Sequence, residues 1–188
     1  ALAPHSMFFM NEECRDAHAR WLGRDLADSP LIPLPVEAPN ACWQPAFGTD
    51  IRIVSVGRLV DFKAYNLGAP AILKQLSDAG VNASWDIYGY GELESDVRAA
   101  VAVAGVDEKL RLCGKLAYEQ FHEVVVSYDV FVGMGTAAIE AAMIGVPTVV
   151  ATVGEKRGTH GFMHEVSFGN VGERIPGRVV RDIGELLR

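Results

Sequence analysis

The sequence has little positive charge for its length. Its 188 residues contain 17 Lys and Arg against 24 Asp and Glu, so the net charge is −7. Proteins that bind nucleic acid without sequence preference use excess positive charge to neutralise phosphates. The charge balance therefore argues against a nucleic-acid partner. The sequence also lacks any apolar run approaching the roughly 18 residues that a membrane-spanning helix needs.

Cysteine is scarce as well. Cys14, Cys42 and Cys113 form an odd and widely spaced set, which disfavours a disulfide framework and fits a reducing compartment. The hydrophobic share of 49% and the charged share of 22% are typical of a folded globular protein. The chain begins with Ala rather than Met, so we expect a fragment or a processed chain.

The first 48 residues differ in character from the rest. A helix is predicted at residues 11–23, with Asn11 as its N-cap. The prolines that follow allow one short extended piece at Leu31–Val36 and then a linker. We therefore expect residues 1–48 to form an interdomain helix, short strand and linker, and residues 49–188 to form a domain.

Short apolar runs alternate with helical patterns from residue 51 onward. Such alternation is typical of a parallel sheet covered by helices on both faces. Because these crossovers are right-handed, the sequence predicts an α/β domain with a doubly wound, Rossmann-like parallel sheet. The expected strands are Ile51–Val56, Ser84–Tyr88, Leu110–Cys113, Asp129–Val132 and Thr148–Ala151, and the expected helices lie near 66–79, 92–104, 117–126, 136–144 and 179–187.

Glycine follows each of the first four expected strands. These turns share the carboxyl edge of a parallel sheet, where open α/β sheets bind their ligands. Glycine lets the backbone approach a ligand closely, so four such turns favour a ligand site at this edge. The glycines are Gly57, Gly89, Gly91, Gly114, Gly133 and Gly135.

Polar residues at the same edge indicate an anionic ligand. Arg58 and Lys63 follow the first strand, and a guanidinium with an ammonium suits a diphosphate. Thr136 begins a helix, whose first turn offers unpaired N–H groups and the positive end of the helix dipole. Glu140 lies one turn further on, where a carboxylate suits ribose hydroxyls. The alternative for each residue is a plain surface or turn position.

Four motifs occur in one order along the chain: Gly57-Arg58-Leu59 with Lys63; Tyr88-Gly89-Tyr90-Gly91-Glu92; Leu112-Cys113-Gly114-Lys115-Leu116; and Asp129-Val130-Phe131 with Glu140-Ala141 and Gly145-Val146-Pro147-Thr148-Val149. Together they resemble the nucleotide-sugar-binding half of a GT-B glycosyltransferase, of the group 1 type usually numbered family 4. The resemblance implies the C-terminal half of a GT-B fold. It also implies that the N-terminal, acceptor-binding domain is missing from this chain.

The resemblance assigns roles position by position. It implies that the catalytic residues are Arg58 and Lys63, which hold the donor diphosphate, and Glu140, which binds the ribose. The other donor-binding residues that it implies are Gly57, the backbone amides near Met134, Gly135 and Thr136 beside the diphosphate, and Lys115 and Leu116 at the base.

The reaction that the resemblance implies is retaining glycosyl transfer from a UDP- or GDP-sugar to a carbohydrate or lipid-linked acceptor. Fixed cations would replace a metal ion, and no Asp-x-Asp metal motif or cofactor is expected. The expected setting is cell-surface polysaccharide biosynthesis in the cytoplasm, with peripheral association at the inner face of the membrane. The isolated chain is expected to bind the donor with little or no turnover.

One position departs from the family's pattern. The family often has two glutamates with seven residues between them, and the first would fall at Val132. That carboxylate normally faces the donor sugar or its leaving phosphate. A degenerate nucleotide-binding module without turnover is therefore an alternative.

An NAD(P)-dependent oxidoreductase is the other alternative. Gly133, Gly135 and Ala138 match the loose glycine fingerprint, and Glu155 follows about 20 residues later, where a ribose-binding acid belongs. Against this hypothesis, three strand–helix units precede the fingerprint, which normally follows the first strand of its sheet.

The segment 152–177 contains two histidines with the spacing of zinc ligands. His160 and His164 have the spacing of two ligands on one helix turn. The glycines around them disfavour a helix, so we expect this segment to form a loop near the cleft instead.

Overall fold

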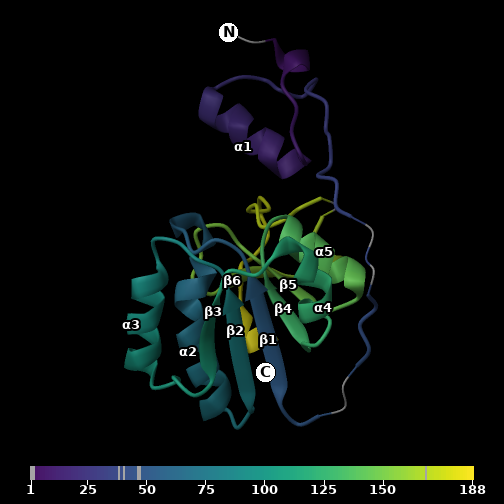
Figure 1. Cartoon of the computed structure of the whole chain (residues 1–188). Coiled ribbons are helices and arrows are strands. Elements are labelled where there is room, and N and C mark those ends of the chain that lie inside the picture. The colour runs from purple at the N-terminus through teal and green to yellow at the C-terminus, as the bar shows by residue number, and fades with distance from the viewer. Residues whose placement is uncertain (1–2, 38, 40, 46–47, 168) are drawn as a thin grey trace.

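The computed structural model describes residues 3–37, 39, 41–45, 48–167 and 169–188. Its central feature is a seven-stranded sheet in the order β3-β2-β1-β4-β5-β6-β7 (Figure 1). The first five strands are parallel, whereas β6 runs antiparallel to β5 and β7 antiparallel to β6. The strands are β1 (Ile51–Val56), β2 (Ala83–Tyr88), β3 (Leu110–Gly114), β4 (Val130–Gly133), β5 (Thr148–Ala151), β6 (Gly158–Phe162) and β7 (Arg181–Asp182).

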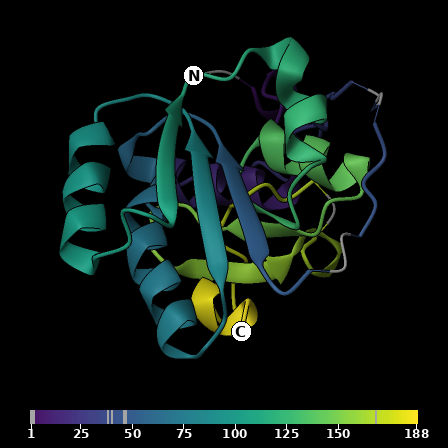
Figure 2. The ribbon, with the colours of Figure 1, turned by 60° about the horizontal axis from the view of Figure 1, so that its bottom comes forward.

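Helices cover both faces of the sheet, as the apolar strands require. One layer contains α2 (Tyr65–Asp78), α3 (Glu94–Ala104) and α6 (Ile183–Leu186), which pack on the larger core cluster. The other layer contains α4 (Phe121–Val125) and α5 (Thr136–Ile144), which pack on a second, smaller cluster (Figure 2). The predicted α/β class and doubly wound sheet are confirmed.

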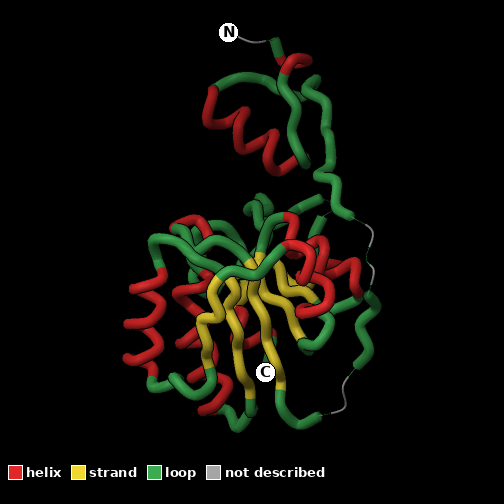
Figure 3. The backbone as a smooth tube through the Cα atoms, in the orientation of Figure 1, coloured by secondary structure: helices red, strands yellow, loops and turns green. Residues whose placement is uncertain are grey.

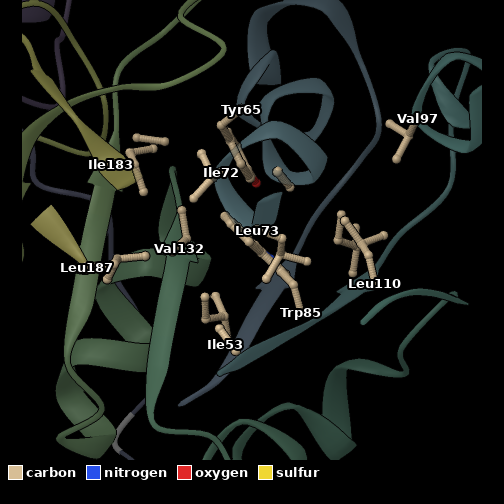
Figure 4. Packing of buried hydrophobic residues seen from close by; sticks show 14 of the residues in the cluster. Ile53, Tyr65, Ile72, Leu73, Trp85, Val97, Leu110, Val132, Ile183 and Leu187 are labelled. Atoms are coloured by element: carbon tan, nitrogen blue, oxygen red, sulfur yellow. The ribbon is translucent and has the colours of Figure 1, made fainter. Parts of the chain in front are cut away.

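A buried chain of hydrogen bonds joins three adjacent strands, β2, β1 and β4. Trp85 on β2 donates from Nε1 to Ser55 Oγ on β1 at 2.9 Å, and Ser55 Oγ donates to the carbonyl of Val132 on β4 at 2.6 Å. Trp85 and Val132 lie in the larger core cluster with Ile53 (Figure 4). The centre of the sheet is therefore rigidly tied beneath the edge where β1 and β4 end.

The segment around helix α1 (Glu12–Leu22) lies outside the sheet and its helical layers, beyond the carboxyl edge of the sheet (Figures 1 and 3). Helix α1 is capped as expected, because the Asn11 side chain accepts from Cys14 N at 2.7 Å and Gly23 adopts a left-handed conformation with φ 61°. No residue of α1 is buried. The Asn11 side chain also donates to the Gly169 carbonyl at 2.7 Å, which links this segment to the sheet domain.

Three element predictions need correction. The expected short strand at Leu31–Val36 forms only an isolated bridge between Phe9 and Leu31, since its prolines cannot donate to a ladder. The helix expected at 117–126 is shorter, because a 3-10 turn, Tyr118–Gln120, precedes α4. The helix expected at 179–187 divides into β7 and α6.

The segment 152–177 is not the loop that the sequence suggested, because it contains β6. The strand sequence GTHGF has no apolar run. Its glycines allow close packing instead: a Cβ on Gly158 would lie 2.7 Å from Glu155 Cβ and from Val180 Cγ1. Within the described residues, no helix is long and apolar enough to cross a membrane.

Candidate functional site

A cavity of about 960 Å³ opens at the carboxyl edge of the sheet, at the ends of β1 and β4. The strand order reverses here, because β1 leads outward to β2 and β3 while β4 leads the other way to β5. Open α/β sheets bind ligands at such switch points. All nine site residues named from the sequence line this cavity: Gly57, Arg58, Lys63, Lys115, Leu116, Met134, Gly135, Thr136 and Glu140. Their chemical roles stay predictions.

Two cations on the turn after β1 form one wall of the cavity. The Lys63 ammonium lies against the backbone of Gly57, where a Cβ would come within 2.7 Å of Nζ. Burial lowers the pKa of Lys63, and the neighbouring charge of Arg58 lowers it further. The charged form of a partly desolvated ammonium beside a like charge is destabilised, and an anionic ligand stabilises it by supplying an opposite charge and hydrogen-bond acceptors. The absent side chain of Gly57 leaves the room for this arrangement.

The first turn of α5 forms the opposite wall. Gly135 is the N-cap, has φ 77°, and brings no capping side chain. Its own amide donates to the Val171 carbonyl at 2.8 Å, so it is less available to a ligand than the sequence suggested. The amides of Thr136 and Ala137, which come next, belong to the first turn and have no acceptor within the helix. They supply donors and the positive end of the dipole to the cavity.

Glu140 places a carboxylate in the cavity wall one turn into α5. The residue is only 5% exposed. Burial raises the pKa of Glu140; the charge of His122 opposes this shift and the charge of Glu37 adds to it. A carboxylate held in this way has a strong tendency to accept hydrogen bonds from any hydroxyl that enters the cavity.

The turn after β3 closes the cavity. It continues from Lys115 and Leu116 through the 3-10 turn to α4. Sequence reasoning missed several residues here and elsewhere in the wall, since none belongs to a recognisable motif. The available signal was the position of Phe62 and Tyr118 in the sequence, one residue before Lys63 and two residues after Leu116. The missed lining residues are Val56, Phe62, Ala117, Tyr118, Glu119, Gln120, Phe121 and Ala137.

The glycines after β2 have a packing role rather than a place in the cavity. A Cβ on Gly89 would lie 1.9 Å from the Gly57 carbonyl oxygen, and one on Gly91 would lie 2.2 Å from the Leu59 carbonyl oxygen. These contacts leave no room for a side chain. The two glycines therefore let the β2 turn press against the β1 turn, which holds Arg58 in position at the cavity.

The structure corrects the placement of the departure at Val132. This residue lies inside β4 with no exposed surface, so a carboxylate at position 132 would face the core rather than a ligand. Only Met134 and Gly135 separate β4 from α5. Neither residue of this connection is acidic, so it brings no second carboxylate to the cavity.

The residues of the alternative hypotheses do not converge. Glu155 pairs with Arg174 and is not among the residues that line the cavity. His160 is buried and its Nε2 accepts from Ile175 N at 3.1 Å, whereas the ring of His164 stacks on Phe162. Within the described part of the chain, no group of three or more His, Cys, Asp or Glu residues is placed to hold a metal ion.

Two curated proteins resemble this chain in sequence. A 2-deoxystreptamine glucosyltransferase from Streptomyces kanamyceticus is 30% identical over 105 residues, which are 53% of this chain and 27% of that protein. The amylovoran biosynthesis glycosyltransferase AmsK from Erwinia amylovora is 29% identical over 113 residues, which are 59% of this chain and 27% of that protein. The matched part of the chain thus spans about a quarter of these relatives.

Solved structures show the same fold at low identity. TarM from S. aureus, in a complex with fondaparinux, alpha-GlcNAc-glycerol and UDP, has a TM-score of 0.62 and 18% identity over 77% of this chain and 29% of that one. Sucrose-phosphate synthase from Thermosynechococcus elongatus has a TM-score of 0.57 and 19% identity over 78% of this chain and 40% of that one. These likenesses support the predicted GT-B domain.

The family model described as "Glycosyl transferases group 1" matches residues 50–171. This region includes the whole cavity wall from Val56 to Glu140 and every motif of the predicted resemblance. The match covers more than half of the chain, and the chain belongs to the glycosyl transferases group 1 family.

Proposed function

We propose that this chain is the donor-binding domain of a glycosyltransferase that uses a nucleoside diphosphate sugar. One observation carries the proposal. At the switch point of the sheet, two crowded cations, Arg58 and Lys63, line the same cavity as the uncapped first turn of α5 and a buried carboxylate, Glu140. A diphosphate linked to a ribose presents the complementary charges and hydroxyls in that order.

The diphosphate would lie between the turn after β1 and the start of α5. Arg58 can donate two hydrogen bonds to phosphate oxygens, and Lys63 supplies a point charge. The free amides of Thr136 and Ala137 would face the diphosphate from the other side. The ribose hydroxyls would donate to Glu140, with the base at Lys115 and Leu116.

The proposed reaction is retaining glycosyl transfer that requires no metal ion. As the bond between the sugar and the diphosphate breaks, negative charge accumulates on the departing phosphate. Arg58, Lys63 and the α5 amides are fixed before the reaction, so they stabilise that charge without reorganising. One such donor in a preorganised site contributes about 2.7–4 kcal/mol.

The donor base and the acceptor are proposed from the relatives. UDP accompanies the structurally similar TarM and the pneumococcal O-GlcNAc transferase GtfA, which favours a UDP-sugar over a GDP-sugar. We propose a carbohydrate or lipid-linked acceptor from the family resemblance; both curated relatives are named as enzymes that transfer a sugar. We propose that a further, N-terminal domain binds the acceptor, and that the enzyme makes cell-surface polysaccharide in the cytoplasm or at the inner membrane face.

A thermal-shift titration tests the donor site on the chain as it stands. We would titrate UDP, GDP, ADP and NAD, and a ligand at 100 times its Kd should add about 2.7 kcal/mol of stability. UDP or GDP should stabilise the chain, and Arg58→Ala and Lys63→Ala should each remove most of the effect. Arg98→Ala is the matched control, because Arg98 pairs with Glu94 on α3 outside the cavity. Stabilisation by NAD alone would refute the proposal.

A further inference from the structure

Two exposed aromatic side chains line the described part of the cavity wall. Phe62 is 46% exposed and directly precedes Lys63, at the cationic end. Tyr118 is 54% exposed and lies in the 3-10 turn before α4, two residues after Leu116. An exposed aromatic ring in a cavity wall presents a flat face on which a ligand ring can stack. Its place in the cavity shows which part of a ligand it would meet.

Tyr118 lines the same cavity as the buried carboxylate, near enough for the charge of Glu140 to act on its hydroxyl. Local desolvation and the nearby charges of Glu140 and Glu37 raise the pKa of Tyr118, so its hydroxyl stays protonated at neutral pH and the ring is neutral. A ribose held by Glu140 would carry its base out of the phosphate cradle and toward this turn. Phe62, beside the cations, would instead face the diphosphate or the sugar.

We propose that Tyr118 stacks on the nucleoside base of the donor and supplies most of the affinity for that base. This inference rests on the proposed function and deepens it by naming the residue that distinguishes a nucleotide from a bare diphosphate. Every base presents a flat π-face, so stacking adds affinity for UDP and GDP alike and does not choose between them. Any choice of base then falls to the polar groups of the turn around Lys115.

The test compares UDP, GDP and inorganic pyrophosphate by isothermal titration. Pyrophosphate occupies the same cradle and has no base. Tyr118→Ala should weaken UDP and GDP by about 5- to 150-fold, whereas pyrophosphate should keep its affinity within about twofold. Tyr118→Phe keeps the ring and should bind UDP within about threefold of the unaltered chain.

Three further variants make the comparison specific. Tyr90→Ala removes an equally exposed tyrosine, at 55%, that lies outside the cavity, and should change neither ligand. Phe62→Ala should not change the ratio of the UDP and pyrophosphate affinities. Arg58→Ala should weaken both ligands together, because it acts on the diphosphate.

Each other outcome overturns a defined part of the argument. If Tyr118→Ala leaves UDP binding unchanged, or weakens UDP and pyrophosphate equally, Tyr118 does not stack on the base. If Phe62→Ala selectively weakens UDP, the base lies at the other end of the cavity. If the unaltered chain binds pyrophosphate but no nucleotide, the inference fails while the anion site stands. If it binds none of the three ligands, the proposed function fails too.

Discussion

Replacing Glu140 with glutamine should make the free protein more stable and the nucleotide complex weaker. Glu140 is 5% exposed and its pKa is raised, so the ionised carboxylate is held at a cost in free energy. Glutamine has nearly the same shape and no charge, so the free energy of unfolding at pH 8 should rise.

The pH dependence follows from the sign of the shift. A folded-state pKa above the unfolded value of about 4.3 means that this group favours folding most below that value. The contribution is lost as pH rises through the raised folded-state pKa. Glu140→Gln should remove this slope, whereas Glu123→Gln, an exposed carboxylate on α4 outside the cavity, should keep it. Chemical denaturation between pH 4 and pH 8 measures the difference.

The loss of binding should be specific to ribose. Replacing the charged carboxylate of Glu140 with a neutral amide should reduce the binding free energy of UDP by about 1–2 kcal/mol. This corresponds to a Kd for UDP that is weaker by about 5- to 30-fold. In titrations with UDP and 2′-deoxy-UDP, the unaltered chain should prefer UDP, and Glu140→Gln should reduce that preference. Equal losses for both ligands, or no loss for either, would refute the assignment of Glu140 to the ribose.

Three other substitutions test separate parts of the account. The lowered pKa of Lys63 means that its ammonium loses its proton at a pH below the usual value of about 10.4. UDP affinity should therefore fall as the pH rises through this lowered pKa, whereas Lys63→Arg should keep its affinity over the same pH range. If the unaltered chain and Lys63→Arg have the same pH profile, Lys63 does not have the proposed role. Gly57→Ala places a Cβ 2.7 Å from Lys63 Nζ at a backbone φ of 158°. It should lower the melting temperature, because this conformation disfavours a side chain, and it should weaken UDP in calorimetry; unchanged UDP affinity would show that Lys63 need not lie there. Ser55→Ala leaves the buried Trp85 Nε1 without its acceptor. It should lower the free energy of unfolding by about 1–3 kcal/mol in denaturant melts and leave the affinity for UDP unchanged. A loss of UDP affinity would mean that the hydrogen bonds between the strands help to position the cavity residues.

The parallel part of the sheet could be predicted because its strands carry their own signal. β1 to β5 are apolar runs between helical patterns, and α1 begins and ends at an N-cap and a glycine. β6 could not be found in this way, because its glycines and histidine are buried by what packs on them rather than by hydrophobicity. Propensity reports the local sequence, and β6 depends on neighbours from β5 and β7.

The candidate site was predictable for a related reason. Residues at the ends of successive parallel strands must meet at one edge, so Arg58, Lys115 and Gly135 come together whatever the details of packing. Spacing along the sequence was less informative where a connection is short. The family's spacing of two glutamates points to Val132, but the apolar run Asp129–Val132 and the helix from Thr136 already predict that this position lies inside a strand, as it does in β4. Tyr118 was missed because its turn carries no motif.

A crystal structure of this chain with UDP would test the central claim most directly. The account predicts the diphosphate within hydrogen-bond distance of Arg58, Lys63 and the amides of Thr136 and Ala137, with the ribose on Glu140. A nucleotide bound away from this cavity, or a diphosphate that does not touch the two cations, would contradict the claim that the switch point of this sheet is a donor site.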